Sequence, residues 1–182
     1  MLERDQTLEL FLRSVERRSF RMAQIACGNT EDALDIIQET MLSFVRAYAR
    51  KTESHWKPLY YRVLQNKITD HHRRSGIRRK WRVWPLPSRT SEEDTIDSHG
   101  DGPDSEGKNP EEQVFELAAL DRLDKSLEKL SLRQRQAFLL RAWEGMSVEE
   151  TARAMQCTKG TVKQHYTRAV QTLREDLGDF ES

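Results

Sequence analysis

The sequence predicts an all-α chain made of two small helical domains. Apolar residues recur every three or four positions in both halves, no stretch competes as an alternating strand, and a polar acidic segment interrupts the helical pattern near the middle. A length of 182 residues suits one large domain or two small ones. With 36% hydrophobic against 33% charged residues, thin helical layers fit better than one deep core.

Three helices are predicted in the first half. Apolar residues recur at helical spacing over residues 8–26 and stop at Gly28, a residue that favours the end of a helix. Either Asn29 or Thr30 can cap the next helix, whose apolar stripe covers residues 36–48. A basic pair directly after this stripe marks the end of the second helix.

The third helix follows a polar segment, residues 51–57. Pro58 suits the first position of a helix, where its missing backbone N–H costs nothing. We expect the helix to continue to about Arg74. One of its faces is formed by Tyr60, Val63, Leu64, Ile68 and His71.

Charge is distributed unevenly, although the net charge is zero. Residues 57–89 contain ten basic residues against one acidic residue, Asp70. Residues 91–112 reverse the sign, with nine acidic residues and one basic residue in a stretch rich in Ser, Gly and Pro, which is typical of a disordered linker. The predicted organisation is an N-terminal domain at residues 1–87, an acidic linker at 88–109 and a C-terminal domain at 110–182.

The C-terminal domain begins with a helix that runs from Pro110 to about Leu130. Acidic residues 111 and 112 occupy its first turn, where the helix dipole favours anions. Ser131 and Gln134 then have the spacing of a capping box, so a further helix starts there. Its expected core face comprises Phe138, Leu139 and Ala142.

Residues 146–174 have the proportions of a helix-turn-helix. Gly145 can end the preceding helix, and Ser147 with Glu150 repeats the capping-box spacing. After a short turn, Thr158 can cap a longer helix. We expect this last helix to bury Val162, Tyr166, Ala169, Val170 and Leu173.

The exposed side of the last helix is basic and polar, which suits the major groove of DNA. Its cations can neutralise phosphates, and its amide, hydroxyl and lysine side chains can reach base edges. A helical hairpin with a solvated basic face is the alternative, but the agreement of caps, turn and charge favours DNA binding. The candidate residues are Lys159, Thr161, Lys163, Gln164, His165, Thr167 and Arg168.

Two further faces are candidates for binding. Asp32, Asp35 and Glu39 share one side of the second helix and could dock on a basic partner, although an ordinary solvated face has the same spacing. On the third helix, one strip combines cations with side chains able to hydrogen-bond an unpaired base. That strip comprises Arg62, Asn66, Thr69, Asp70 and Arg73. Trp56 and Tyr61 could supply stacking surfaces beside it, although Trp56 is equally suited to a buried contact.

The sequence argues against catalysis, bound metals and membrane insertion. It contains no phosphate-binding loop, and the adjacent His71 and His72 diverge on a helix, so they cannot easily share a ligand; we expect one in the core and one beside a phosphate. Cys27 and Cys157 are isolated, which fits a reducing cytoplasm, and no cofactor is indicated. No apolar run approaches the roughly 20 residues that cross a bilayer.

Several stretches resemble the extracytoplasmic-function group of bacterial sigma factors. Residues 132–141, 144–152 and 160–169 follow the pattern of that family's C-terminal domain. Residues 32–40 resemble its polymerase-docking helix, and residues 60–74 resemble its promoter-opening helix. The chain departs from the pattern at Leu34, where an acid is usual; at Ser131, where proline is frequent; and at Gln156, where a turn glycine is common.

The resemblance implies that the chain binds core RNA polymerase and promoter DNA, and it allows for an anti-sigma factor as a further partner. The N-terminal domain would recognise and melt the minus-ten element, with residues 51–57 helping to select bases, and the last helix would read the minus-thirty-five element. The implied polymerase-binding residues are Asp32, Asp35, Gln38 and Glu39. The DNA-binding residues of the N-terminal domain would be Arg62, Asn66, Lys67, Arg73 and Arg74.

Two other classes of binding protein compete with this interpretation. A stand-alone helix-turn-helix regulator would bind DNA as a symmetric dimer without polymerase. An interaction protein such as a sigma antagonist would need no basic recognition helix. The basic, Asn-containing third helix and the acidic second helix favour the sigma factor.

Overall fold

The computed structural model describes residues 2–81 and 122–178, and within these ranges the chain forms helices joined by short turns. The predicted all-α class is thereby confirmed for the described residues. The predicted linker at 88–109 and the predicted helix start at Pro110 lie outside them. The helices are α1 (Leu2–Cys27), α2 (Thr30–Tyr48), the 3-10 turn η1 (Glu53–His55), α3 (Trp56–Trp81), α5 (Leu132–Phe138), the π-helical turn η2 (Leu139–Trp143), α6 (Val148–Met155) and α7 (Lys159–Leu177), and residues 122–129 are also helical.

Helix ends in the first half follow the predicted signals. Gly28 adopts a positive φ of 78°, and the Asn29 side chain accepts a hydrogen bond from the Asp32 backbone N–H, so Asn29 rather than Thr30 is the cap of α2. Helix α3 starts at Trp56, two residues before Pro58. Proline is tolerated there because the first four N–H groups of a helix have no intrahelical acceptor.

The N-terminal unit, α1 to α3 with η1, is held together by an aromatic cluster. Phe11 of α1 has its ring centroid 5.5–5.9 Å from the rings of Phe44, Trp56 and Tyr60, so one side chain contacts both other helices. Trp56 and Tyr60 are almost completely buried. Edge-to-face and tilted ring pairs of this kind add specific contacts to the apolar area removed from water.

The C-terminal unit, residues 122–178, relies on helix caps around a smaller aliphatic core. Both predicted capping boxes are present, at Ser131 with Gln134 and at Ser147 with Glu150, and Thr158 caps α7. The core side chains include Leu127, Leu140, Met146, Met155 and Val162. Because the helices here are as short as seven and eight residues, their ends contribute a large share of the stability.

The predicted core face of the segment after Ser131 is partly wrong. Leu139 is buried, but Ala142 is exposed and Leu140 takes the inward position. The cause is the π-helical turn η2, in which the Glu144 N–H donates to the Leu139 carbonyl five residues earlier. One extra residue in the turn rotates the following side chains relative to an α-helix.

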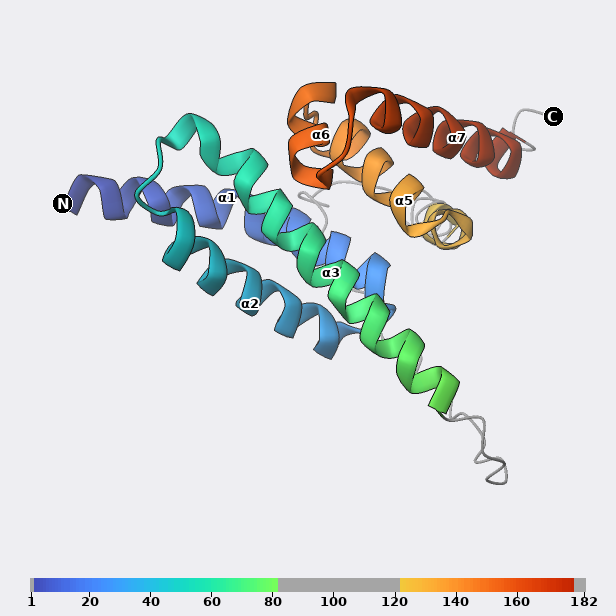
Figure 1. Ribbon diagram of the computed structural model, residues 1–182, viewed down its shortest axis with the longest axis horizontal. Coiled ribbons are helices and arrows are strands. Elements are labelled where there is room, and N and C mark those ends of the chain that lie inside the picture. Colours follow the sequence, from blue (N-terminus) through green and yellow to red (C-terminus); the bar gives the residue numbers. More distant parts are fainter. Residues whose placement is uncertain (1, 82–121, 179–182) are drawn as a thin grey trace, which may run out of the picture.

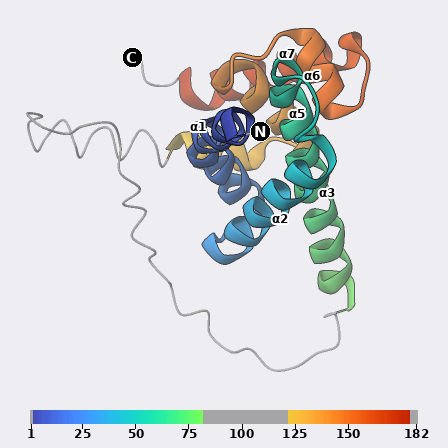
Figure 2. The ribbon, with the colours of Figure 1, turned by 90° about the vertical axis from the view of Figure 1, so that its left-hand side faces the viewer.

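The two units pack against each other along α3. Helix α3 contacts α2 on one side and α6 on another, so it lies between the rest of the N-terminal unit and the C-terminal unit. Figure 2 shows the same arrangement from the end of α1, with α6 and α7 on the opposite side of the molecule from α2. The face of α2 that points away from α1 and α3 is therefore separate from the contact between the units.

Candidate nucleic-acid interface

The face of α7 keeps the predicted cations and polar groups on the surface. Lys163, Gln164, Thr167 and Arg168 are exposed, whereas Val162, Ala169 and Leu173 pack inward. Helix α7 packs on α5 and α6, which leaves its outer side uncovered within the described chain. The predicted division into an inner and an outer face of α7 is confirmed, with Tyr166 and Val170 at its boundary.

The remaining α7 candidates are partly engaged within the C-terminal unit. Lys159 is exposed and forms an ion pair of 3.1 Å with Glu149 of α6. The Thr161 hydroxyl lies 2.9 Å from that of the cap residue Thr158. Burial, and then the neighbouring guanidinium groups of Arg133 and Arg168, lower the pKa of His165, so the fold favours the neutral form of this side chain, which can contribute a hydrogen bond.

The turn before α7 contains a backbone conformation that is unfavourable for its residue. Gln156 ends α6 with φ 53° and ψ 47°, in the left-handed region. For a residue with a side chain this conformation costs about 1–2 kcal/mol. The absence of the usual turn glycine is thus a departure that the fold tolerates at a cost. The Gln156 side chain makes contacts outside its own unit that a glycine could not make.

Those contacts are with the predicted DNA-binding strip of α3. The Gln156 amide donates to the Asn66 side-chain oxygen at 2.8 Å, and Arg62 donates to the Gln156 oxygen at 3.4 Å. Nearer the C-terminal end of α3, Asp70 and Arg73 are exposed and form an i,i+3 ion pair of 3.8 Å. The strip exists as predicted, but its first two members are in contact with the C-terminal unit.

Two aromatic residues near this strip are not stacking surfaces. Tyr61 is fully buried, and Trp56 is 2% exposed with its indole N–H donating to the Lys51 carbonyl at 3.0 Å. The prediction of a stacking role is therefore wrong for Tyr61, and for Trp56 the buried alternative is correct. Helical periodicity could not predict that both Tyr60 and the adjacent Tyr61 are buried. The C-terminal unit, a third packing partner, covers the Tyr61 ring.

The acidic side of α2 is partly neutralised by α3. Glu39 accepts a hydrogen bond from Lys67 at 2.8 Å, which lowers the Glu39 pKa. Asp32 lies 3.6 Å from His71, whereas Asp35 and Gln38 remain exposed. A cavity of about 220 Å³ lies between the helices, and Arg74 is among the side chains that line it. The shared helical face is confirmed, but two of its three carboxylates are paired within the fold.

The adjacent histidines separate as expected on a helix, and each has its own surroundings. His71 lies beside Asp32 at the edge of α2, whereas His72 is half-buried towards the C-terminal unit. Burial, and then the charges of Arg135 and His71, lower the pKa of His72. His72 therefore lies on the side of α3 that faces α1 and α5. Within the described ranges, no group of three His, Cys, Asp or Glu side chains could hold a metal ion.

A cavity of about 680 Å³ lies where the two units meet. One wall comes from the segment predicted to select bases and from the start of α3, and includes His55, Pro58 and Arg62. The other wall is Arg153 of α6 and Gln156, the C-cap residue of that helix. Sequence reasoning found neither Arg153 nor the buried residues Arg135 and Glu144 that join the units, because a contact between distant segments leaves no periodic signal.

Comparison with known proteins identifies the family of this chain. Residues 8–78 match the family model for sigma-70 region 2, and residues 120–173 match the model for sigma-70 region 4. The RNA polymerase sigma-E factor of Streptomyces avermitilis is 31% identical over 170 residues, which cover 93% of this chain and 84% of that protein. This chain belongs to the sigma-70 family, in its extracytoplasmic-function group.

Other relatives and solved structures agree with this membership. The extracytoplasmic-function RNA polymerase sigma factor SigD of Mycobacterium bovis is 29% identical over 151 residues, and the match covers 80% of this chain and 65% of SigD. The sigma factor RpoE of Bartonella quintana, solved with the anti-sigma factor NepR, has a TM-score of 0.69 at 22% identity over 98% of both chains. CnrH, solved with the cytosolic domain of CnrY, has a TM-score of 0.60 at 18% identity over 97% of this chain and 90% of CnrH. These two structures support the fold of this sigma-70 family member.

Proposed function

We propose that this chain is a promoter-specificity subunit of bacterial RNA polymerase. It binds the core enzyme, directs it to promoters that carry paired upstream elements, and helps to separate the DNA strands. The observation that carries the proposal is the presence, in order, of sigma-70 regions 2 and 4, each with a polar or basic helical face where the family function requires one. The chain acts by binding and performs no catalysis.

Each proposed role has a surface that supports it. The exposed part of α2, with Asp35 and Gln38, is available for docking on core polymerase. Arg62, Asn66, Arg73 and Arg74 on α3, together with Lys67, would bind the melted minus-ten element. Helix α7 would enter the major groove at the minus-thirty-five element through Lys163, Gln164, Thr167 and Arg168, with Lys159, Thr161 and His165 nearby.

The proposed domain boundaries are those expected from the charge pattern: 1–87 for docking and melting, 88–109 as linker and 110–182 for the distal element. No helix within the described residues is long and apolar enough to cross a membrane. We propose that the protein acts in the cytoplasm, where its polymerase is, and that an anti-sigma factor is a further partner, as the structures of RpoE with NepR and CnrH with CnrY suggest.

Run-off transcription from a genomic fragment library tests the proposal. Core polymerase is assayed with and without the protein, and new RNA 5′ ends are sequenced. Starts that depend on the protein and share two upstream elements are the expected result. Sequence-specific DNA binding that neither requires nor redirects core polymerase would contradict it and would favour the stand-alone regulator. Asp35→Lys is the matched variant, because it should reduce transcription by weakening polymerase binding while leaving α7 intact.

A further inference from the structure

The segment between α2 and α3, residues 51–57, is called the base-selecting segment below, because the proposed function has it choose bases in the minus-ten element. The side chains of Lys51, Thr52 and His55 are exposed and line the cavity of about 680 Å³ at the start of α3. A surface segment can discriminate between bases only if the surrounding structure holds its side chains in one place. The contacts that hold this segment therefore bear on promoter specificity.

The hydrogen bonds that the segment's own backbone donates are local. The Lys51 N–H donates to the Tyr48 carbonyl at 2.9 Å, and the His55 N–H donates to the Thr52 carbonyl at 2.9 Å. Both bonds close short turns between residues three positions apart. They give the segment its local shape, and its position relative to α1 has to come from contacts with other elements.

Arg4 of α1 binds the start of the segment. Its Nε donates to the Ala49 carbonyl at 3.2 Å, and its Nη2 donates to the Lys51 carbonyl at 2.9 Å. These two nitrogens belong to one planar guanidinium group, whose N–H groups form a rigid fork. Ala49 is the C-cap of α2, and the last carbonyls of a helix lack intrahelical donors and favour a cation. One side chain thus links α1 both to the end of α2 and to the base-selecting segment.

Trp56 supplies a second donor to the same carbonyl. Its indole N–H donates to the Lys51 oxygen at 3.0 Å, and its ring centroid lies 5.5 Å from that of Phe11. A carbonyl oxygen has two lone pairs, so two donors fix the orientation of the peptide group that follows Lys51. Arg4 and Phe11 are about two helical turns apart and share one face of α1. That face supports the segment directly through Arg4 and indirectly through the pair of rings.

Arg4 occupies a position where helical spacing favours an apolar residue. The inward stripe of α1 includes Leu8, Phe11 and Val15, which belong to the core or pack against it, and Arg4 continues this stripe by one turn. An apolar side chain at this position would leave the Ala49 and Lys51 carbonyls without this donor. At this level α1 meets backbone carbonyls rather than an apolar core, which accounts for the guanidinium group.

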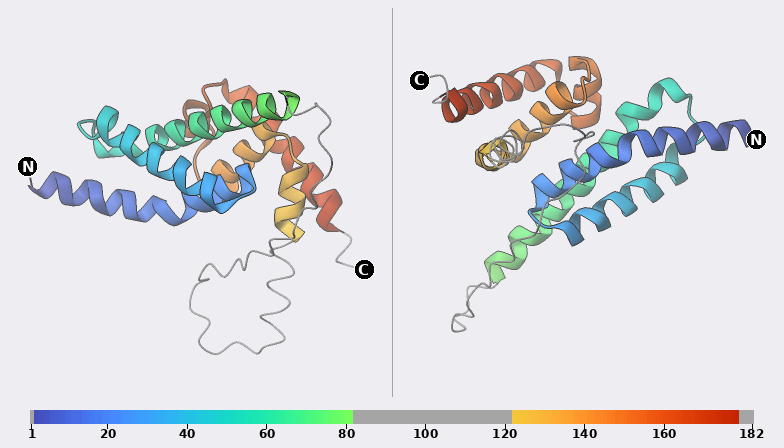
Figure 3. Two further views of the ribbon diagram at one scale, coloured as in Figure 1. Left: turned by 90° about the horizontal axis from the view of Figure 1, so that it is seen from below. Right: turned by 180° about the vertical axis from the view of Figure 1, so that it is seen from behind.

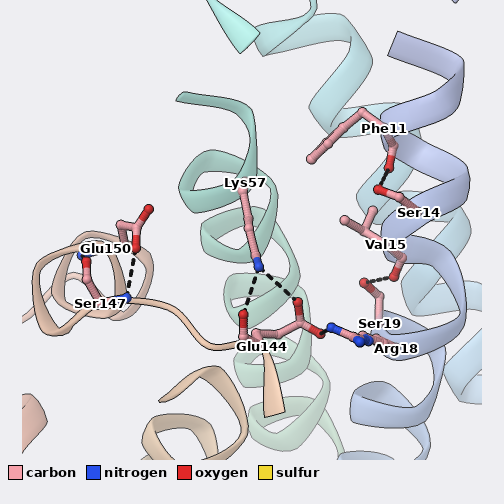
Figure 4. Close-up of polar contacts among 9 residues, drawn as sticks. All are labelled: Phe11, Ser14, Val15, Arg18, Ser19, Lys57, Glu144, Ser147 and Glu150. Carbon is pink, nitrogen blue, oxygen red and sulfur yellow. Dashed lines mark hydrogen bonds and ion pairs between the residues drawn. The ribbon is translucent and has the colours of Figure 1, made fainter. Parts of the chain in front are cut away.

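The other end of the segment has a separate anchor. Lys57 donates to the Glu144 backbone carbonyl at 2.8 Å, and its ammonium group lies 3.5 Å from the Glu144 carboxylate. Figure 4 shows Lys57 reaching Glu144 from α3, with Arg18 of α1 beside the same carboxylate. Lys57 is already a residue of α3, so this contact fixes the helix rather than residues 51–55. The position of those residues depends on the anchor at the Lys51 carbonyl.

We propose that Arg4 is a positioning residue for base selection in the minus-ten element. Its guanidinium group fixes the Lys51 carbonyl and thereby holds the exposed side chains of Lys51, Thr52 and His55 in place relative to α3. Arg4 acts through the segment and makes no base contact of its own. The inference rests on the proposed function, whereas the anchor itself is a property of the free protein and can be measured without polymerase.

Hydrogen exchange measured by NMR on the full chain tests the anchor. Arg4→Met keeps a long side chain but removes both donors, so the bonded amides of Lys51 and His55 should exchange about five-fold faster, with the middle of α2 unchanged. Arg13→Met is the matched control, because Arg13 is an exposed cation of α1 that pairs with Glu9. It should exchange like the parent. Parental exchange of both amides in Arg4→Met would overturn the proposal.

A promoter library tests the selecting role. Core polymerase and the full-length protein transcribe barcoded templates in which the minus-ten and minus-thirty-five elements are randomised, and the transcripts report the preferred bases. Arg4→Met should lower the preference for the best minus-ten base by about five-fold, the factor that one hydrogen bond supplies, and leave the minus-thirty-five preference unchanged. Arg13→Met should keep both preferences. A variant that is only less stable would lose starts from all templates alike and keep both preferences.

Arg4→Lys separates positioning from charge. Lysine keeps the positive charge but lacks the rigid fork, so this variant should select minus-ten bases nearly as poorly as Arg4→Met. If Arg4 instead bound a DNA phosphate, its charge would be sufficient and Arg4→Lys would match the parent. That result, or an Arg4→Met variant with the parental base preference, would contradict the positioning role.

The proposed function and this inference can fail separately. A parent that directs no protein-dependent starts would remove the proposed function and the selecting role with it, whereas faster exchange in Arg4→Met would still establish the anchor. Protein-dependent starts with the same minus-ten preference in the parent and Arg4→Met would remove this inference alone.

Discussion

The two helical units are stabilised in different ways. In the N-terminal unit, helices of 19 and 26 residues meet around large buried rings, among them Phe44, Trp56 and Tyr60. In the C-terminal unit, α5 and α6 have seven and eight residues and begin at capping boxes. The comparison indicates that the N-terminal unit, which we propose binds polymerase and the minus-ten element, depends on core volume, whereas the placement of α7 depends on local hydrogen bonds and turn geometry.

The largest expected effect is loss of an aromatic core side chain. Tyr60 is fully buried between Phe11 and Phe44, and Tyr60→Ala should lower the free energy of unfolding by about 3–5 kcal/mol. Urea denaturation followed by circular dichroism measures this change. Leu10→Ala is the control, because Leu10 is 67% exposed and its truncation should have little effect. Similar decreases in the free energy of unfolding for Tyr60→Ala and Leu10→Ala would mean that the aromatic rings do not hold α1, α2 and α3 together.

A smaller effect is expected when a cap is removed from the C-terminal unit. Ser147→Ala deletes the acceptor for the Glu150 N–H and should cost about 1 kcal/mol, chiefly in α6. Hydrogen exchange should locate faster exchange in α6 and the start of α7, with α2 unchanged. Ser14→Ala provides the comparison, because Ser14 is an exposed residue inside α1 whose hydroxyl bonds only to the Phe11 carbonyl. If the two serine variants exchange alike, caps are not the main support of this unit.

The turn at Gln156 allows strain and side-chain contacts to be separated. Both Gln156→Ala and Gln156→Gly remove the bonds to Asn66 and Arg62, but only glycine also removes the left-handed strain. The glycine variant should therefore be more stable than the alanine variant by about 1 kcal/mol in thermal denaturation. An alanine variant as stable as the glycine variant would show that the turn relaxes to another conformation.

The smallest expected effect is a pH dependence that comes mainly from residues of α3 and α7. Burial and nearby cations lower the pKa values of His72 and His165, so the folded state resists protonation more than the unfolded state does. Stability should be fully present above the ordinary histidine pKa of 6.5 and decline as pH falls below it. Denaturation at pH 7.5 and at pH 5.5 should show this loss of stability. The double variant with His72→Gln and His165→Gln should lose less stability between the two pH values. An unchanged pH profile in that double variant would assign the dependence elsewhere.

Local signals in the sequence determined most of the helical framework. Gly28, Asn29, Ser131, Ser147 and Thr158 each end or cap a helix where the sequence predicts, because caps depend on residues within three or four positions. The outward faces of α7 and α2 also follow from helical periodicity alone. The sigma-factor pattern lies in these same local segments, so family membership could be inferred from the residues themselves.

Only the tertiary structure decided how these segments meet. Tyr61 is buried rather than available for stacking, Glu39 is paired with Lys67, and Arg62 contacts a residue 94 positions away. Glu144 and Arg135 are charged residues at buried positions, which periodicity assigns to the surface. The physical reason is that the spacing of apolar residues shows only which side of a helix is apolar. A polar contact between distant units is made by charged residues, and in the sequence these look the same as charged residues on a solvated surface.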